Sequence, residues 1–225
     1  MVLTNAGDMA FASLAAIQAY GGTPSGAGEY GAAGTVYLKG TNQAYGRLTV
    51  NNNSKSSTRL TLLNSAVTDK TVGDVVLRNL GYMSLSAGET LTVNGSWSNA
   101  VATNAISGGT VALAGPAAAM VWGGNTWSNL TIATAGKTVS FEAGKVQTVY
   151  GVPVFSNVTL QSTAAGSWWY LLKPGVGTQE VGVVTVRDSN ATNGMTFVAA
   201  VGSADQGNNV NWRFLAPKGT LLMLR

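Results

Sequence analysis

Apolar and polar residues alternate along short segments that recur from residue 35 towards the C-terminus. In segments such as 47–50 and 138–141 every second residue is apolar, and β-branched residues are frequent. Gly, Asn and Ser stand between the segments, where they favour tight turns. This period of two predicts strands of about four to six residues joined by turns. The segments with this pattern are 35–38, 47–50, 59–63, 75–77, 89–93, 129–132, 138–141 and 183–186.

Residues 9–20 are the one stretch with helical periodicity. Phe11, Leu14 and Ile17 recur every three residues in an Ala-rich segment, and Asp8 is suited to cap the first turn. The same segment also fits a buried Ala-rich strand, so a short N-terminal helix and a strand are both open. The Gly-rich residues 21–34 predict a loop.

Internal similarity points to a repeat architecture. Residues 34–40 (Gly-Thr-Val-Tyr-Leu-Lys-Gly) recur as 109–115 (Gly-Thr-Val-Ala-Leu-Ala-Gly), identical at five of seven positions. A longer unit at 74–95 is echoed at 128–151 and begins again at 156. Units of about 22–27 residues have the length of one solenoid coil.

The repeat predicts an all-β solenoid. Three short strands form one coil, and coils stack about 4.8 Å apart because a single coil cannot bury its apolar face. About eight or nine coils would make a rod roughly 40 Å long. A β-sandwich is the alternative, since it also places strands every 8–12 residues or so. The repeats and the low charge favour the solenoid.

A set of segments resembles the right-handed parallel β-helix of large bacterial surface and secreted proteins, of the adhesin or autotransporter-passenger type. The resemblance covers about residues 30–214. It implies a scaffold or adhesive role, although some such proteins cleave polysaccharides, and the chain lacks a recognisable catalytic signature of those. The segments that carry it are 34–38, 46–50, 127–132, 136–141, 186–191 and 207–212.

Composition narrows the chemistry further. The 225 residues include neither Cys nor His, which excludes disulfides, thiolate sites, imidazole bases and His-ligated metals. We therefore expect no catalytic residues, no cofactor and no resident metal. Only 10% of the residues are charged, against roughly 25% in ordinary soluble domains. Such a weakly charged surface favours contact with copies of the same chain.

The basic residues give no sign of nucleic-acid binding. The net charge is +4, and the 13 Lys and Arg are scattered singly rather than clustered. The first eight residues lack a signal-peptide pattern, and no apolar run is long enough to span a membrane as a helix. The composition is nevertheless typical of exported proteins, so we expect an extracellular or cell-surface location.

Two groups of acidic residues are candidates for chemistry. Glu89 and Glu142 fall at matching points of successive units and would stack, although corner positions on the solvent face explain both more simply. The segments 188–194 and 205–209 carry oxygen ligands suitable for Ca²⁺, but Asx turns explain them equally well.

Aromatic residues offer a contact surface for carbohydrate or for a neighbouring subunit. Trp168 and Trp169 are adjacent, so on a strand they must point to opposite faces, one inward and one outward. Trp122, Trp127 and Tyr170 belong to the same set of candidates. Ordinary packing in the core is the competing explanation.

The predicted organisation is an N-terminal cap or assembly segment (1–30), a solenoid domain (31–214) and an apolar C-terminal tail (215–225). Solenoid ends leave unpaired strand edges that attract another chain. We expect a non-enzymatic structural or adhesive protein that self-associates into a fibre or larger assembly; the alternative is a module that binds or cleaves cell-surface polysaccharide. The expected assembly residues are Phe11, Leu14, Ile17, Leu221, Leu222 and Leu224.

Overall fold

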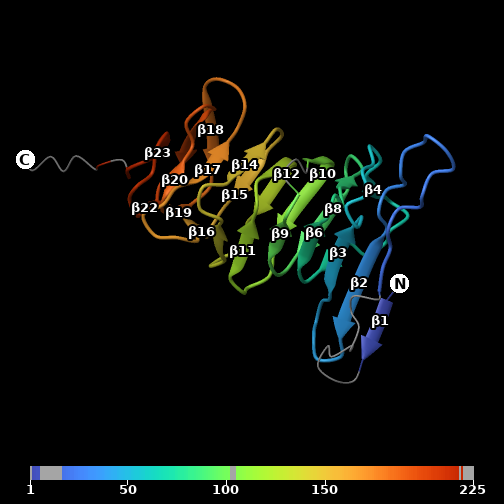
Figure 1. Ribbon diagram of the computed structural model, residues 1–225. Coiled ribbons are helices and arrows are strands. Elements are labelled where there is room, and N and C mark those ends of the chain that lie inside the picture. Colours follow the sequence, from blue (N-terminus) through green and yellow to red (C-terminus); the bar gives the residue numbers. More distant parts are fainter. Residues whose placement is uncertain (1, 6–16, 102–104, 218, 220–225) are drawn as a thin grey trace, which may run out of the picture.

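The protein is an elongated parallel β-solenoid of about seven turns (Figure 1). The computed structural model describes residues 2–5, 17–101, 105–217 and 219, and these contain strands but no helix. The predicted all-β solenoid is therefore confirmed over the alternative sandwich. The solenoid has fewer turns than the roughly eight or nine predicted. One reason is that the described residues before β3 form a loop over 21–34 and the reversed strand β2 instead of a further coil.

The first face of the solenoid is a ten-stranded sheet. All neighbouring strands in it are parallel except β2 and β3, which form an antiparallel pair. Its strands in spatial order are β1 (Val2–Asn5), β2 (Thr35–Gly40), β3 (Arg47–Asn51), β6 (Val75–Arg78), β9 (Trp97–Asn99), β11 (Ala119–Trp122), β13 (Thr138–Phe141), β16 (Val158–Ser162), β19 (Val184–Val186) and β22 (Ala204–Asp205).

Two further faces complete each coil. The second face contains β4 (Thr61–Leu63), β7 (Met83–Leu85), β14 (Val146–Val149), β17 (Trp169–Leu172) and β20 (Ser189–Asn190). The third contains β5 (Thr71–Val72), β8 (Thr90–Val93), β15 (Pro153–Phe155), β18 (Thr178–Val181), β21 (Thr196–Ala199) and β23 (Trp212–Phe214). The long strands β10 (Ala105–Leu113) and β12 (Asn125–Ile132) each contribute to both faces.

Alternation builds the core in ladders that run along the axis. Strands of the first face bury every second side chain, and equivalent positions lie in register on neighbouring coils. One such ladder consists of Leu48, Val75, Trp97, Val121 and Phe141, all buried. Each coil therefore buries its apolar face against the next one.

Buried polar side chains accommodate the tryptophans of this core. Trp97 and Trp127 pack edge to face with ring centroids 4.8 Å apart. The Trp97 Nε1–H donates to Asn125 Oδ1 at 2.8 Å, and the Trp127 Nε1–H donates to Gln147 Oε1 at 3.3 Å. The Asn125 Nδ2–H also donates to Gln147 Oε1, at 3.0 Å. The amides thus satisfy indole donors that would otherwise be costly to bury.

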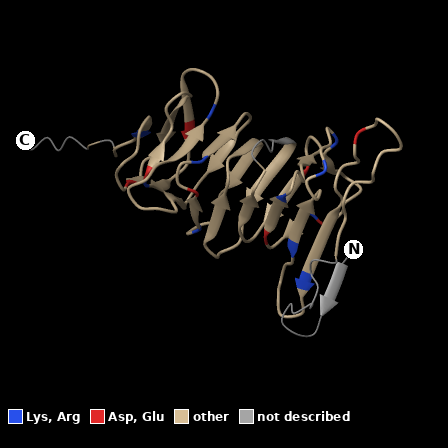
Figure 2. Ribbon diagram, viewed as in Figure 1, with Lys and Arg blue, Asp and Glu red and all other residues tan. Residues whose placement is uncertain are grey.

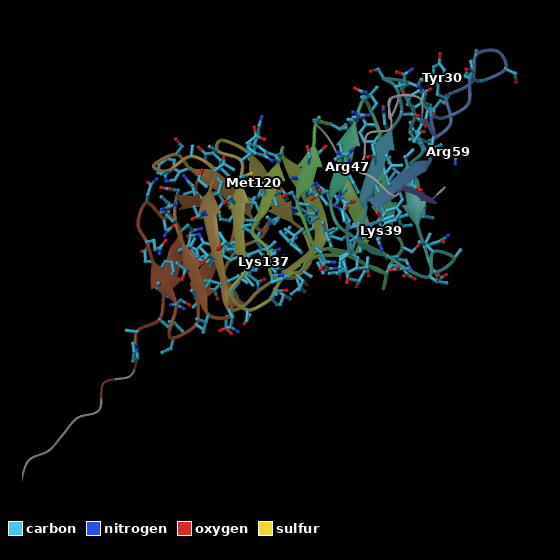
Figure 3. The ribbon with its side chains drawn as sticks, turned by 90° about the horizontal axis from the view of Figure 1, so that it is seen from below. Tyr30, Lys39, Arg47, Arg59, Met120 and Lys137 are labelled. Atoms are coloured by element: carbon cyan, nitrogen blue, oxygen red, sulfur yellow. The ribbon has the colours of Figure 1, made fainter. Side chains whose placement is uncertain are left out.

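Lys137 is a second buried polar group, at the corner before β13 (labelled in Figure 3). Its ammonium donates to the backbone oxygens of Ala117 at 2.8 Å and Gly115 at 3.2 Å. Loss of hydration on burial lowers the pKa of Lys137 below its ordinary value of 10.5. The side chain holds together the corners of two neighbouring coils.

Gly and Asn occupy most of the left-handed positions in the described chain, in line with the solenoid prediction; Ser54, Leu80 and Asp188 occupy others. Asn53, Asn79, Asn157 and Asn208 have φ between 49° and 55°. Asn tolerates this conformation better than most side chains because it can form local hydrogen bonds. Neighbouring corners are linked along the axis: the Ser54 N–H donates to the Asn79 backbone oxygen at 3.0 Å.

The internal repeats occupy different places from those expected. Residues 34–40 form the reversed strand β2 on the first face, whereas 109–115 lie at the end of β10 on the third. The unit 74–95 begins on the first face, but its echo 128–151 begins within β12 on the third. Sequence similarity thus marked strands and turns correctly and misaligned the coils, because any buried strand with Gly at its ends satisfies the same pattern.

The helix or strand expected over residues 9–20 lies mostly outside the described residues. Residues 17–20 are described and are not helical. They run into the loop over 21–34, which projects from the N-terminal end of the solenoid (Figure 1).

Candidate functional site: the two ends of the solenoid

The C-terminal end of the solenoid finishes on unpaired strands and on aromatic rings. Among the described residues, β22 and β23 are the last strands of their sheets. Trp212 stacks on Phe197 with ring centroids 4.9 Å apart, and Phe214 lies 6.0 Å from Trp212. Both Trp212 and Phe214 are only half buried, and Leu215 beyond them is 41% exposed. This end therefore presents an apolar surface beside free backbone groups.

The N-terminal end is built differently, because a reversed strand lies over the first coil. β2 pairs antiparallel with β3, and β1 adds to the outer edge of β2 (Figure 1). The loop over 21–34 is tied to the first coil by the buried Asn52, whose Oδ1 accepts from the Gly21 N–H at 2.8 Å. The Thr61 hydroxyl of β4 donates to the Ala33 oxygen at 2.5 Å. The first and second faces are thus covered at this end.

The third face leaves an opening into the core at the same end. A hollow of about 300 Å³ is lined by apolar side chains that include Tyr37, Leu48, Leu63, Val72 and Leu91. Asp69, Lys70 and Thr71 also line the hollow, and Lys70 Nζ lies 2.8 Å from a Glu89 carboxylate oxygen. The apolar part of such a hollow accepts an apolar side chain rather than a charged one.

The predicted assembly residues are only partly placed. Phe11, Leu14, Leu221, Leu222 and Leu224 lie outside the described residues. Ile17 is half buried and lines a hollow on the outer side of the first face, beside Leu38 and Arg47, rather than the axial end of the solenoid.

Sequence reasoning missed the residues that form the two ends. Trp212, Phe214 and Leu215 close the C-terminal coil, and Tyr37 lies at the opposite opening. The alternation of apolar residues at 210, 212 and 214 is the signal for a last strand. The sequence pattern alone does not indicate that this strand belongs to the last coil of the described residues.

The paired tryptophans lie as alternation predicts. Trp169 is buried and stacks on Phe141 with ring centroids 4.1 Å apart and an angle of 16° between the planes. Trp168 is 38% exposed, and its Nε1–H donates to the Asn208 oxygen at 3.0 Å. Of the two, only Trp168 reaches the surface.

The acidic candidates do not form a pair. Glu89 lies at the corner that leads into β8 of the third face, whereas Glu142 follows β13 of the first face. The stacking alternative is therefore wrong, because the repeat that aligned the two residues is offset by one strand, and both lie at the ends of strands as the simpler explanation expected. Glu142 is held by the chain itself, since its carboxylate accepts from the Gly123 N–H at 2.6 Å.

The carboxylates of the two candidate calcium segments accept hydrogen bonds from the protein itself, from other coils at Asp188 and in an Asx turn at Asp205. The Asp188 carboxylate accepts from the Gly166 N–H at 3.1 Å and from Asn208 Nδ2 at 2.8 Å. Asp205 Oδ1 accepts from the Gly207 N–H at 2.9 Å. Within the described ranges no group of three or more Asp or Glu side chains is arranged to hold a metal ion.

Comparison with known proteins adds no assignment: no family model, no curated protein and no solved structure matches this chain significantly. In the described part of the chain, no helix is long and apolar enough to cross a membrane.

Proposed function

We propose that the protein is a non-enzymatic structural subunit that associates with copies of itself end to end. One observation carries the proposal: the last described coil exposes unpaired strand edges together with the half-buried pair Trp212 and Phe214. At the other end, the hollow beside Tyr37 offers an apolar acceptor for such a surface. Contact between two different ends is heterologous, so it propagates into a filament when it does not close into a ring.

The weakly charged surface supports the same proposal. Lys, Arg, Asp and Glu are sparse over most of the solenoid (Figure 2). Charge normally protects sheet edges from association, and here little of it opposes contact. In line with the sequence resemblance, we propose an extracellular or cell-surface location and a scaffold or adhesive role of the adhesin or autotransporter-passenger type.

Sedimentation of the full chain at increasing concentration tests the proposal. Leu215→Asp places a charge at the C-terminal end with little loss of core, because Leu215 is 41% exposed. Val152→Asp is the matched control, since Val152 is 56% exposed and lies between β14 and β15, away from both ends of the solenoid. We expect the parent chain and Val152→Asp to form larger species as concentration rises, while Leu215→Asp stays monomeric.

Two outcomes would contradict end-to-end association. One is a parent chain that remains monomeric at the highest concentration. The other is association that Leu215→Asp leaves unchanged.

A further inference from the structure

The outer side of the first face carries a furrow that the proposed self-association does not use. Three hollows of about 250, 300 and 390 Å³ follow one another along it. The first and second share Arg47, and the second and third share Ser98 and Trp122. The furrow runs from β3 across β6, β9 and β11 to Glu142, which directly follows β13, and at about 4.8 Å per strand this is a length of about 19 Å.

The furrow exists because one coil has small outward side chains between two coils with larger ones. Ser98 of β9 lies in register between Val76 of β6 and Trp122 of β11. Ser96, one outward position earlier, lines the same hollow. Trp122 is 40% exposed, so its ring forms a wall that a ligand can contact.

The carboxylates in the furrow accept hydrogen bonds from backbone N–H groups of the protein itself. An Asp74 carboxylate oxygen accepts from the Ser96 N–H at 2.7 Å, and Glu142 accepts from the Gly123 N–H at 2.6 Å. Their charge is thereby partly neutralised within the coil.

The basic side chains in the furrow are not paired with carboxylates of the described residues. Arg47, Arg78 and Lys145 line the furrow, and none of them makes an ion pair with another described residue. The Nε atom of Arg47 is buried without a hydrogen-bond partner. Arg47 as a whole is partly exposed, so an anion that reaches its guanidinium would meet a positive charge that no described carboxylate pairs with.

We propose that this furrow binds an extended anionic polysaccharide, with a sugar ring against Trp122 and carboxylate or sulfate groups at Arg47, Arg78 and Lys145. The flat ring of Trp122 can pack against a sugar ring, and the hydroxyl groups of Ser96 and Ser98 can form hydrogen bonds with sugar hydroxyls. The separated cations can pair with acidic groups that are spaced along a polysaccharide chain. Single-stranded nucleic acid fits less well, since it needs closely spaced bases and several stacking rings.

Binding titrations of the full chain test the site, with intrinsic tryptophan fluorescence or calorimetry as the readout. The probes are polygalacturonate (carboxylated), a sulfated dextran and unmodified dextran, with an oligothymidylate as the nucleic-acid control. We expect the carboxylated or the sulfated chain to bind and added salt to weaken it, while dextran and the oligonucleotide bind much less. The two acidic probes decide between carboxylate and sulfate.

Variants locate the binding. Trp122→Ala and Arg78→Gln are expected to raise the Kd about tenfold. The matched controls Trp168→Ala and Arg213→Gln leave it unchanged, because both residues are exposed away from the furrow. Circular dichroism verifies that each variant is folded, and Arg78 is exposed enough for its replacement to spare the core.

The proposal is overturned if neither acidic polysaccharide binds, or if dextran or the oligonucleotide binds equally well. It is also overturned if both furrow variants bind like the parent chain, or if Trp168→Ala removes binding and Trp122→Ala does not.

Discussion

Adjacent side chains in this protein have sharply different roles, and Trp168 and Trp169 illustrate how. Trp169 fills the core against Phe141, whereas Trp168 lies on the surface. The strand period of two determines which faces they occupy. Neighbouring residues therefore contribute differently to the stability of the fold, because their side chains lie on opposite faces of the same sheet.

This difference predicts unequal losses of stability. Trp169→Ala leaves a cavity in the core and is expected to lower the free energy of unfolding by about 3–5 kcal/mol. Trp168→Ala removes a surface ring and is expected to cost less than about 1 kcal/mol. Urea unfolding followed by circular dichroism measures both, and similar losses for the two variants would contradict the assignment of the faces.

The buried Lys137 predicts a dependence of stability on pH. Its pKa is lowered in the folded protein, so between that lowered value and 10.5 the unfolded chain binds more protons than the folded one. The free energy of unfolding contributed by Lys137 therefore rises with pH across this window.

Lys137→Met isolates this contribution. The difference in unfolding free energy, parent minus variant, should increase as pH is raised from neutrality towards 10.5, when measured in urea at several pH values. A difference that is flat or that decreases with pH would show that burial does not disfavour the charged form.

At the scale of elements, the corners determine how closely the coils approach. At Gly123, φ is +81° and a Cβ would lie 2.0 Å from the Asn99 oxygen of the preceding coil. At Gly144, φ is +76°, but a Cβ would meet no atom within 4 Å. The two corners share a left-handed backbone and differ in crowding.

Replacement by Ala separates the cost of a left-handed backbone from the cost of crowding against the neighbouring coil. Gly144→Ala should lower the free energy of unfolding by about 1–2 kcal/mol, the cost of a left-handed conformation. Gly123→Ala should cost more, because the coils must also move apart. Equal losses in denaturant titrations would mean that the close approach at Gly123 is not important for stability.

The strands could be predicted from sequence, whereas their assignment to faces could not. Every alternating segment from 35–38 to 183–186 overlaps a strand of the structure. The face occupied by each strand depends on corners of variable length: paired residues of adjacent coils are 19 positions apart at Thr185 and Ala204 but 27 apart at Leu48 and Val75. A variable period hides the alignment of coils, and this is why Glu89 and Glu142 seemed equivalent.

The furrow was hidden from sequence analysis for the same reason. Arg47, Ser98 and Trp122 are far apart in the chain and meet only because their coils stack on one face. The reversed strand β2 was equally hidden, since its residues match the pattern of the forward strand in β10.

At the scale of the whole molecule, we propose that the C-terminal end of one subunit contacts the N-terminal end of the next, and that this contact repeats along the assembly. The third face opens beside Tyr37 at one end, and Trp212 and Phe214 finish the other. A contact of this kind aligns successive solenoids along a common direction, because the same two surfaces meet each time.

Electron microscopy of the concentrated full chain tests this claim most directly. The account predicts filaments or short rods in which elongated subunits join at their tips, and it predicts single subunits when Leu215 is replaced by Asp. Separate monomers of the parent chain, or assemblies joined side by side along the walls of the solenoid, would contradict it.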